Sequence, residues 1–386
     1  MTFYTGRRLT FGLCLLFAML APVTGSADER GLLWWSDDLS GMRESIAAQG
    51  LSMEVAYIGE FVRNLDPGLV SPRKETIYQD NLDLIATLDT EQAGMWSGGT
   101  FFVYGLFNHG GFPSASLIGD LQAASNIEAA RNQFILHQAW YEHDFSDGAV
   151  SLLAGLHDLN ADFYGSEYGA LFINSSFGIG PEVSGNVPTS LFPQAAWGLR
   201  ARVSPDERWY VLAAVYDGDP ATRSMSGVQG YMSIFEAGLT PGEGNSYKAG
   251  IWHHSADRTV AGQTFGSDYG VYGLADQGLL SLPGGGELGG FLQLGWVPKQ
   301  RNDITRYLGA GLHLSGLPLR AGDELGLAVG NAYTRSGTEH AIELTWRAPL
   351  LAGVTVQPSM QWIMNPGGNA AAGTMRVALL RFELVL

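Results

Sequence analysis

Alternation of apolar and polar residues, in about sixteen stretches of roughly ten residues each, runs through most of this chain. A period of two is typical of a β-strand with one apolar and one polar face. The gaps between the stretches are long, short, long, short almost to the C-terminus. A closed up-and-down barrel shows this rhythm when tight turns occupy one rim and longer loops the other. We therefore expect an all-β fold, a transmembrane antiparallel β-barrel of about sixteen strands with a short N-terminal helical segment.

The first 27 residues have the three regions of a secretory signal peptide. Arg7 and Arg8 are the positive region, residues 9–20 are apolar, and Gly25 to Ala27 are small residues suited to cleavage. A membrane anchor is the alternative, but the apolar run is short for a spanning helix and lacks a stop-transfer flank. We expect residues 1–27 to be a signal peptide and the mature chain to be exported to the bacterial outer membrane.

Residues 28–50 are expected to form an N-terminal periplasmic, helical segment, because residues 32–50 do not alternate. Leu39, Met42 and Ile46 have helical spacing, and Ser40 is placed to cap a helix that ends near Gly50. The helix could lie on the surface before the barrel, or against the periplasmic mouth. The barrel itself is expected to span residues 51–386.

Composition and motifs exclude several function classes. The only cysteine, Cys14, lies in the signal, so thiol chemistry, disulfides and cysteine metal sites are not expected. Without the two signal arginines, 20 Lys and Arg face 38 Asp and Glu, and this net charge of −18 lacks the basic footprint of nucleic-acid binding. No catalytic signature is found, and His253 and His254 point to opposite faces of a strand. We expect no enzyme activity, cofactor or metal site.

The longest gap, residues 158–194, is the candidate site of selectivity. A loop of this length is usually functional or disordered, and its aromatic and small residues favour an ordered loop. It either folds inward and narrows the lumen or packs as a lid on the outer rim. Two arginines and nearby acids could form a constriction, and two tryptophans could stack on a sugar ring. The pore-lining and sugar-contact candidates are Arg200, Arg202, Glu142, Trp140, Asp158, Asn160, Asp162, Asn174 and Trp252. The alternative is interior charge balancing without solute contact.

The last stretch, residues 376–386, is an amphipathic strand that runs to the chain end. It resembles the signal that outer-membrane assembly machinery recognises, although the chain ends in Leu386 rather than in an aromatic residue. With an even number of strands and a periplasmic N-terminus, both ends and the tight turns lie in the periplasm. The long loops are then extracellular, and outer-membrane lipid surrounds the barrel.

Several segments, in this order and spacing, resemble the carbohydrate-selective porin (OprB-like) family over nearly the whole mature chain. They are residues 35–50 with Gly41-Met42-Arg43, 53–60, 98–101, 140–142, 154–163, 172–178 and 216–220. The resemblance implies a sixteen-stranded outer-membrane barrel and passive, sugar-preferring diffusion into the periplasm. Similar proteins tend to carry a basic residue after the glycine that matches Gly155, whereas this chain has Leu156.

The expected function is therefore passive diffusion of small sugars, without nucleic-acid partners. Two alternatives stay open at this point: a weakly selective general porin for organic acids or other small nutrients, and a non-conducting barrel that is an enzyme or a surface-binding protein.

Overall fold

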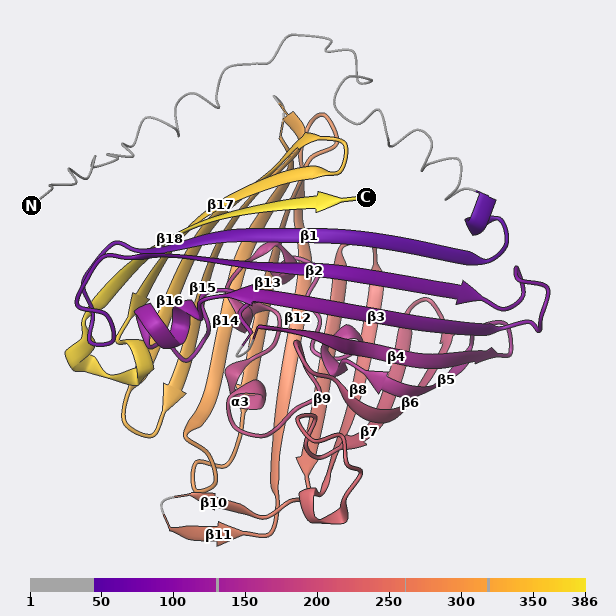
Figure 1. The fold of residues 1–386 in the computed structure, drawn as a ribbon, viewed down its shortest axis with the longest axis horizontal. Helices are drawn as coiled ribbons and strands as arrows, with labels where there is room; N and C mark the ends of the chain where they lie inside the picture. Colours follow the sequence, from indigo (N-terminus) through magenta and orange to yellow (C-terminus); the bar gives the residue numbers. More distant parts are fainter. Residues whose placement is uncertain (1–44, 130–131, 261, 318–319) are drawn as a thin grey trace, which may run out of the picture. The chain divides into compact units, whose positions relative to one another are not determined.

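Antiparallel strands close into one barrel in the computed structural model, which describes residues 45–129, 132–260, 262–317 and 320–386 (Figure 1). Sixteen strands form the ring, and the first pairs with the last through the register Glu60 to Arg381. The prediction of an all-β antiparallel barrel of about sixteen strands is confirmed. Among the described residues, no helix has the length and apolar character needed to cross a membrane.

Each barrel strand pairs with its neighbours along the chain, except that β9 pairs directly with β12. The strands are β1 (Leu51–Asn64), β2 (Thr76–Asp89), β3 (Gly99–Gly110), β4 (Gln133–Phe145), β5 (Val150–His157), β6 (Ala196–Asp206), β7 (Trp209–Asp217), β8 (Tyr231–Gly242), β9 (Asn245–His254), β12 (Asp268–Ser281), β13 (Glu287–Trp296), β14 (Ile304–Leu317), β15 (Arg320–Thr334), β16 (Thr338–Leu351), β17 (Val354–Met364) and β18 (Thr374–Val385).

The connections confirm the predicted alternation of long and short gaps. We call the rim with tight turns, such as 146–149 and 243–244, the short-turn rim, and the opposite one the long-loop rim. The long-loop rim carries the 65–75, 111–132, 158–195, 218–230 and 255–267 connections, among others. The last of these contains an unpredicted hairpin of β10 (Arg258–Val260) and β11 (Gln263–Phe265), seen at the bottom of Figure 1.

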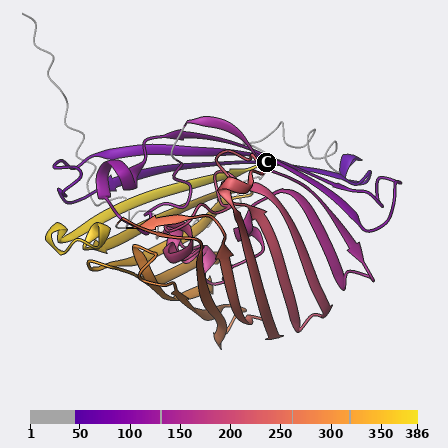
Figure 2. The ribbon, with the colours of Figure 1, turned by 90° about the horizontal axis from the view of Figure 1, so that it is seen from below.

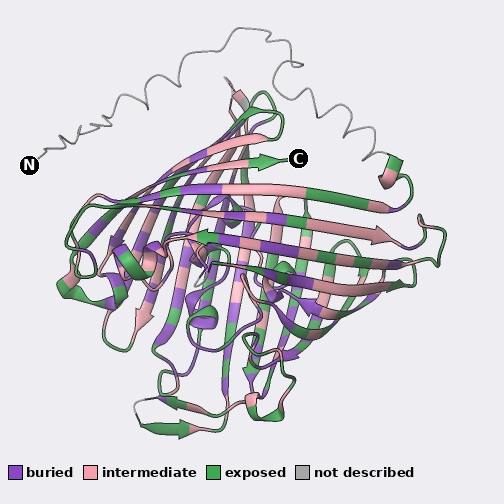
Figure 3. Cartoon of the chain, in the orientation of Figure 1, coloured by how far each residue is buried: buried purple, intermediate pink, exposed green. Residues whose placement is uncertain are grey.

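The barrel is apolar outside and polar inside. Large apolar side chains such as Leu199 and Phe134 point outward and are 66% and 61% exposed. Glu236 and Glu343, on inward-facing positions, are 0% exposed. Figure 3 shows exposed and buried residues alternating along the strands. This inside-out distribution is expected where one strand face meets lipid and the other faces a lumen.

Only the end of the N-terminal segment is described. Residues 45–47 are helical, and a turn leads through Gly50, whose φ of +85° favours glycine, into β1. The predicted signal peptide and most of the predicted helix lie outside the described residues.

Candidate functional site

Two loops of the long-loop rim fold into the barrel. The 111–132 loop contains η1 (Ser114–Ile118). The 158–195 loop contains the short helices η2 (Leu159–Ala161), η3 (Gly169–Leu171), η4 (Ser175–Phe177) and α3 (Pro181–Ser184). Gln293 on β13 donates to the Phe177 carbonyl, and Gln357 on β17 donates to the Leu171 carbonyl. In Figures 1 and 2 the 158–195 loop, in magenta, lies among the strands. The loop therefore folds inward and does not pack as a lid on the outer rim.

Apolar contacts fill the space between these loops and much of the wall. The 158–195 loop contributes Phe163, Tyr164 and Val183 to a cluster with side chains from β6, β7, β8, β9 and β12. A second cluster joins the 111–132 loop to β1, β17 and β18, and a third joins Phe172 and Phe177 to β13 and β15. The inward faces of β3, β4 and β5 contribute to none of these three clusters.

Four buried wall carboxylates, the anchor carboxylates, bind the backbone of the two loops. Glu236, Asp276 and Glu343 accept from the 158–195 loop, and Glu339 accepts from the 111–132 loop. The N–H groups are those of Tyr164, Glu167, Tyr168, Ile173, Asn174, Leu121 and Gln122. Charge-assisted hydrogen bonds are stronger than neutral ones, and each satisfies a backbone group that the loop would otherwise bury without a partner. The loops are therefore bonded to the wall as well as packed against it.

Some predicted site residues shape the loop instead of facing water. Asp158 caps η2 by accepting from the Asn160 N–H at 2.8 Å, and Asn174 caps η4 in the same way. Asn160 also donates to the Phe163 carbonyl at 3.0 Å. Asn174 and Trp252 are each 1% exposed, and Trp252 lies in the apolar cluster behind the loop. The side chains of Asn174 and Trp252 are therefore enclosed by protein.

The predicted acids and one arginine meet on the uncovered wall. Arg200 on β6 contacts Glu142 on β4 at 2.8 Å and Asp162 in the loop at 2.7 Å, and it donates to Ser151 on β5 at 2.6 Å. The Glu142 and Asp162 side chains are 21% and 22% exposed. We call Glu142, Arg200 and Asp162 the charged ladder. Water thus reaches the two carboxylates, and the Arg200 side chain, only 5% exposed, lies between them as their counter-charge.

Two histidines extend the charged ladder. His157 lies 3.3 Å from Asp162, and His137 lies 3.2 Å from Asp158. Sequence reasoning missed both, although His157 has the same strand parity as Ser151 and Leu153, whose side chains are buried on the inner side. Leu156 pairs in register with Ala139 and with Trp197, whose side chain is on the outer face, so Leu156 does not face the lumen and is 3% exposed. The first side chain after Gly155 to reach the lumen wall is therefore that of His157.

An aromatic pair lies beside the charged ladder. Trp140 on β4 stacks on Phe102 of β3 with ring centroids 4.7 Å apart and an angle of 13°. The Trp140 indole N–H donates to the Gln138 side chain at 3.2 Å. Both rings are half-buried. Arg202, the second predicted arginine, is exposed, and its guanidinium lies over the Tyr210 ring at 5.5 Å. The structure therefore brings Trp140, Glu142, Asp162 and Arg200 together and places Arg202 on the same strand.

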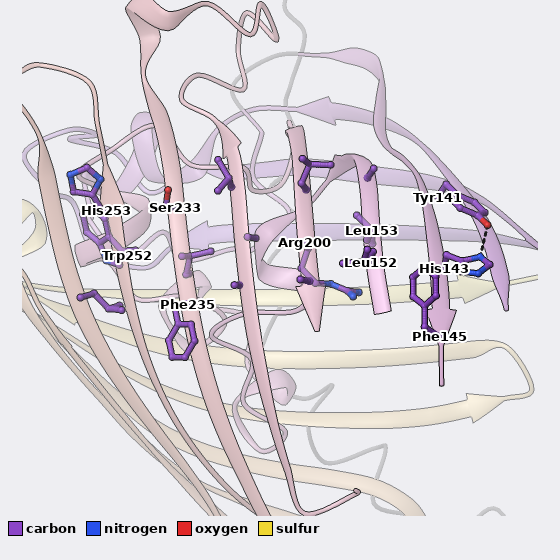
Figure 4. A pocket seen from close by; sticks show the side chains of 18 residues that line it. Tyr141, His143, Phe145, Leu152, Leu153, Arg200, Ser233, Phe235, Trp252 and His253 are labelled. Atoms are coloured by element: carbon purple, nitrogen blue, oxygen red, sulfur yellow. Dashed lines mark hydrogen bonds between the residues drawn. The ribbon is translucent and has the colours of Figure 1, made fainter. Parts of the chain in front are cut away.

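A separate apolar groove lies on the outer face of β4 to β9 (Figure 4). Exposed side chains such as Leu152 and Phe235 surround small ones such as Ala201 and Ala213. Tyr141 and His143 are joined at one end by a hydrogen bond of 2.8 Å. Because this surface is apolar and faces outward, it is no path for polar solutes.

A closed sixteen-stranded barrel with an apolar exterior, a polar wall and an inward long loop is the architecture of a porin. Porins are channels and not enzymes, and they are proteins of the outer membrane. The model of the carbohydrate-selective porin, OprB family matches residues 73–385, and the chain belongs to that family.

Individual proteins agree in fold and extent. Porin B of Pseudomonas aeruginosa is 24% identical over 421 residues, which cover 91% of each chain. The high-pH structure of Pseudomonas putida OprB has a TM-score of 0.83 at 21% identity and covers 90% of this chain and 97% of that one. A triple mutant of Rhodopseudomonas blastica porin has a TM-score of 0.51 at 13% identity, with coverage of 87% and 100%. These structures show a shared barrel fold.

Proposed function

We propose that this porin carries small neutral sugars passively between the wall of β3, β4 and β5 and the 158–195 loop. The carrying observation is the charged ladder next to the Phe102–Trp140 stack. A sugar needs donors and acceptors at short spacing together with a flat apolar surface for its C–H face. Arg200 supplies donors, Glu142 and Asp162 supply acceptors, and Trp140 supplies the surface.

Charge of both signs favours neutral solutes over ions. An anion meets Glu142 and Asp162, and a cation meets Arg200, so either loses part of its hydration against a like charge. A hydroxyl group both donates and accepts, and it can exchange water for these groups without a net charge to desolvate. No energy source is required, because the channel only lowers the barrier to diffusion.

The cellular context is part of the proposal. Residues 1–27 would direct export, residues 28–50 would lie on the periplasmic side, and the C-terminal strand would be read by the assembly machinery. The short-turn rim would then face the periplasm and the long-loop rim the outside, as the connection lengths favour.

Proteoliposome swelling tests the function. Purified protein in liposomes should swell faster in isotonic monosaccharides than in size-matched amino acids or organic acids. Equal rates would support the weakly selective porin instead. Absence of swelling with every solute would show a non-conducting barrel and overturn the proposal.

Two lumen arginines allow a matched comparison. Arg200→Met should slow monosaccharide swelling several-fold and increase cation selectivity, because Glu142 and Asp162 lose their counter-charge. Arg347→Met removes another cation held by two carboxylates, Glu324 and Glu383, from a strand that does not carry the charged ladder. Equal effects of the two variants on the ratio of sugar to organic-acid rates would contradict the role of the ladder.

A further inference from the structure

Arginines and aromatic rings alternate across the outward ends of β12, β13, β14 and β15 at the long-loop rim. The Arg301 guanidinium lies over the Phe265 and Tyr269 rings at 5.2 Å and 5.3 Å. Tyr269 and Trp296 follow at 6.4 Å. Strand register then places Arg306 directly beside Trp296 on one side and Tyr333 on the other. The Arg306 guanidinium lies 4.9 Å over the Tyr333 ring.

Four cations of this region have no carboxylate partner. Lys299 and Arg335 are exposed in the adjoining connections, and Arg306 is exposed on its strand. Within the described ranges, no carboxylate oxygen lies within 4.0 Å of Lys299, Arg301, Arg306 or Arg335, whereas Arg258 and Arg376, also at this rim, have such partners. We call Lys299, Arg301, Arg306 and Arg335 the cationic patch. These four cations lie together without an ion-pair partner in a protein that is strongly acidic as a whole, and the carboxylate next to them in sequence is the exposed Asp303.

The geometry of the patch is held before any ligand arrives. Arg301 donates to the Ser267 carbonyl at 2.6 Å, which fixes its guanidinium over the two rings. The Arg335 N–H donates to the Asp303 carbonyl at 3.0 Å, so the 335–337 connection is tied to the 297–303 connection. Guanidinium groups suit phosphate because they present several N–H donors in one plane.

An apolar face continues directly from the patch toward the other rim. Leu294 and Leu292 follow Trp296 outward on β13, and Leu312 and Leu327 lie on the next two strands, all between 41% and 49% exposed. Aromatic rings at such a boundary mark the level where acyl chains meet polar headgroups. A ligand for this surface therefore needs an anionic head and several acyl chains.

The opposite rim differs. Arg320 is paired with Asp323 at 3.2 Å, and Arg208, the other cation in the described turns of that rim, is a single residue that follows Asp206 and Glu207. The group of four unpaired cations thus belongs to the rim that the proposed orientation turns toward the outer leaflet.

We propose that the cationic patch binds a phosphorylated, multiply acylated glycolipid of the outer leaflet. Its phosphates would contact Arg301, Arg306 and Lys299, and its chains would lie along the leucines of β13 to β15. This inference rests on the proposed orientation of the barrel and does not depend on which solute passes through it.

Binding of bis-phosphorylated lipid A to the purified full-length porin in detergent, measured by native mass spectrometry, tests this site. The wild type should retain one lipid A at a concentration at least ten-fold lower than Arg301→Gln/Arg306→Gln does. Arg73→Gln/Lys74→Gln is the matched control, since it removes the same charge from exposed residues of the same rim and should bind as the wild type does. Lipid A without phosphates should bind to the wild type as weakly as the charged lipid binds to the patch variant.

If both double variants lose lipid A binding equally, the attraction is unspecific and the proposal is overturned. The proposal is also overturned if the wild type retains no lipid A, or if a protein dimer forms in place of the lipid complex. If the arginine variant fails to fold, Lys299→Gln is the substitute test, because Lys299 is exposed and lies outside the stack. This variant should weaken lipid A binding two- to three-fold. Liposome swelling by the patch variant should equal that of the wild type, so a failure here is distinct from a failure of the channel function.

Discussion

From the anchor carboxylates we predict that one buried side chain, which is not part of the charged ladder, controls the width of the pore. Glu343 on β16 accepts the backbone N–H groups of Ile173 and Asn174 at 3.0 Å and 2.9 Å, and the Ser359 hydroxyl at 2.9 Å. Glu343→Gln keeps the shape but removes the charge and replaces one acceptor oxygen with an NH₂ donor. One loop N–H group then loses its partner inside the barrel.

The size of the effect follows from those contacts. A hydrogen bond to a charged group contributes about 1.5–3 kcal/mol, and the abandoned N–H group remains buried. A loss of about 3 kcal/mol in docking of the loop raises the undocked population by roughly 100-fold, since every 1.4 kcal/mol is a factor of ten. The apolar contacts of Phe172 and Phe177 remain, so we expect brief openings and not a permanently detached loop.

Single-channel recording in planar bilayers measures such openings. Glu343→Gln should show more open-channel noise and short steps of higher conductance, and its liposomes should admit larger saccharides than those of the wild type. Glu324→Gln is the control, because the partners of this inward carboxylate among the described residues are His313 and Arg347, both on strands. If Glu343→Gln matches the wild type in noise and size limit, or if the control changes equally, the wall carboxylates do not hold the loop.

Three further predictions concern stability. Burial raises the pKa of Glu182 in the loop from its ordinary 4.5 to about 7. Ionisation of Glu182 should therefore destabilise the folded barrel as pH rises between these two values. In this pH range the thermal midpoint of Glu182→Gln should depend less on pH than that of the wild type. Gly295→Ala should lower the midpoint, because a Cβ would lie 1.9 Å from a Glu182 oxygen, whereas Gly242→Ala has no atom within 4 Å and should leave it unchanged. Hydrogen bonds from Arg376 lower the pKa of Asp66 to about 2, so the stabilisation present above about pH 4 should disappear as pH falls toward 2, and acid titration of Asp66→Asn should lack that loss.

The barrel could be predicted because alternation is a local signal. A strand such as β9 shows its two faces in consecutive residues, and turn lengths give the order of the rims without knowledge of any contact. Strand parity predicted that Arg200 and Glu142 lie on the inner side, on β6 and β4, with β5 between them. Trp252 has the same kind of pattern as Trp140, yet the loop covers one and leaves the other half-buried. Parity predicts the side of the wall and does not predict what covers it.

The anchor carboxylates were missed for a related reason. Glu236 and Glu343 lie on inward-facing strand positions, and their function depends on backbone groups of a loop whose path has no periodic pattern. The β10–β11 hairpin was missed because its strands have only three residues each.

The long separations between the loop and its anchors also order the events of assembly. Ile173 and Glu343 are 170 residues apart, and Gln357 binds a loop carbonyl that precedes it by 186 residues. Contacts of such high sequence separation form late, because the intervening chain must first be brought together. The 158–195 loop is made early but cannot complete its docking until β16 and β17 are in place. An unfinished barrel would therefore have a wider lumen than the finished one, and insertion of the last strands would itself set the final size limit of the channel.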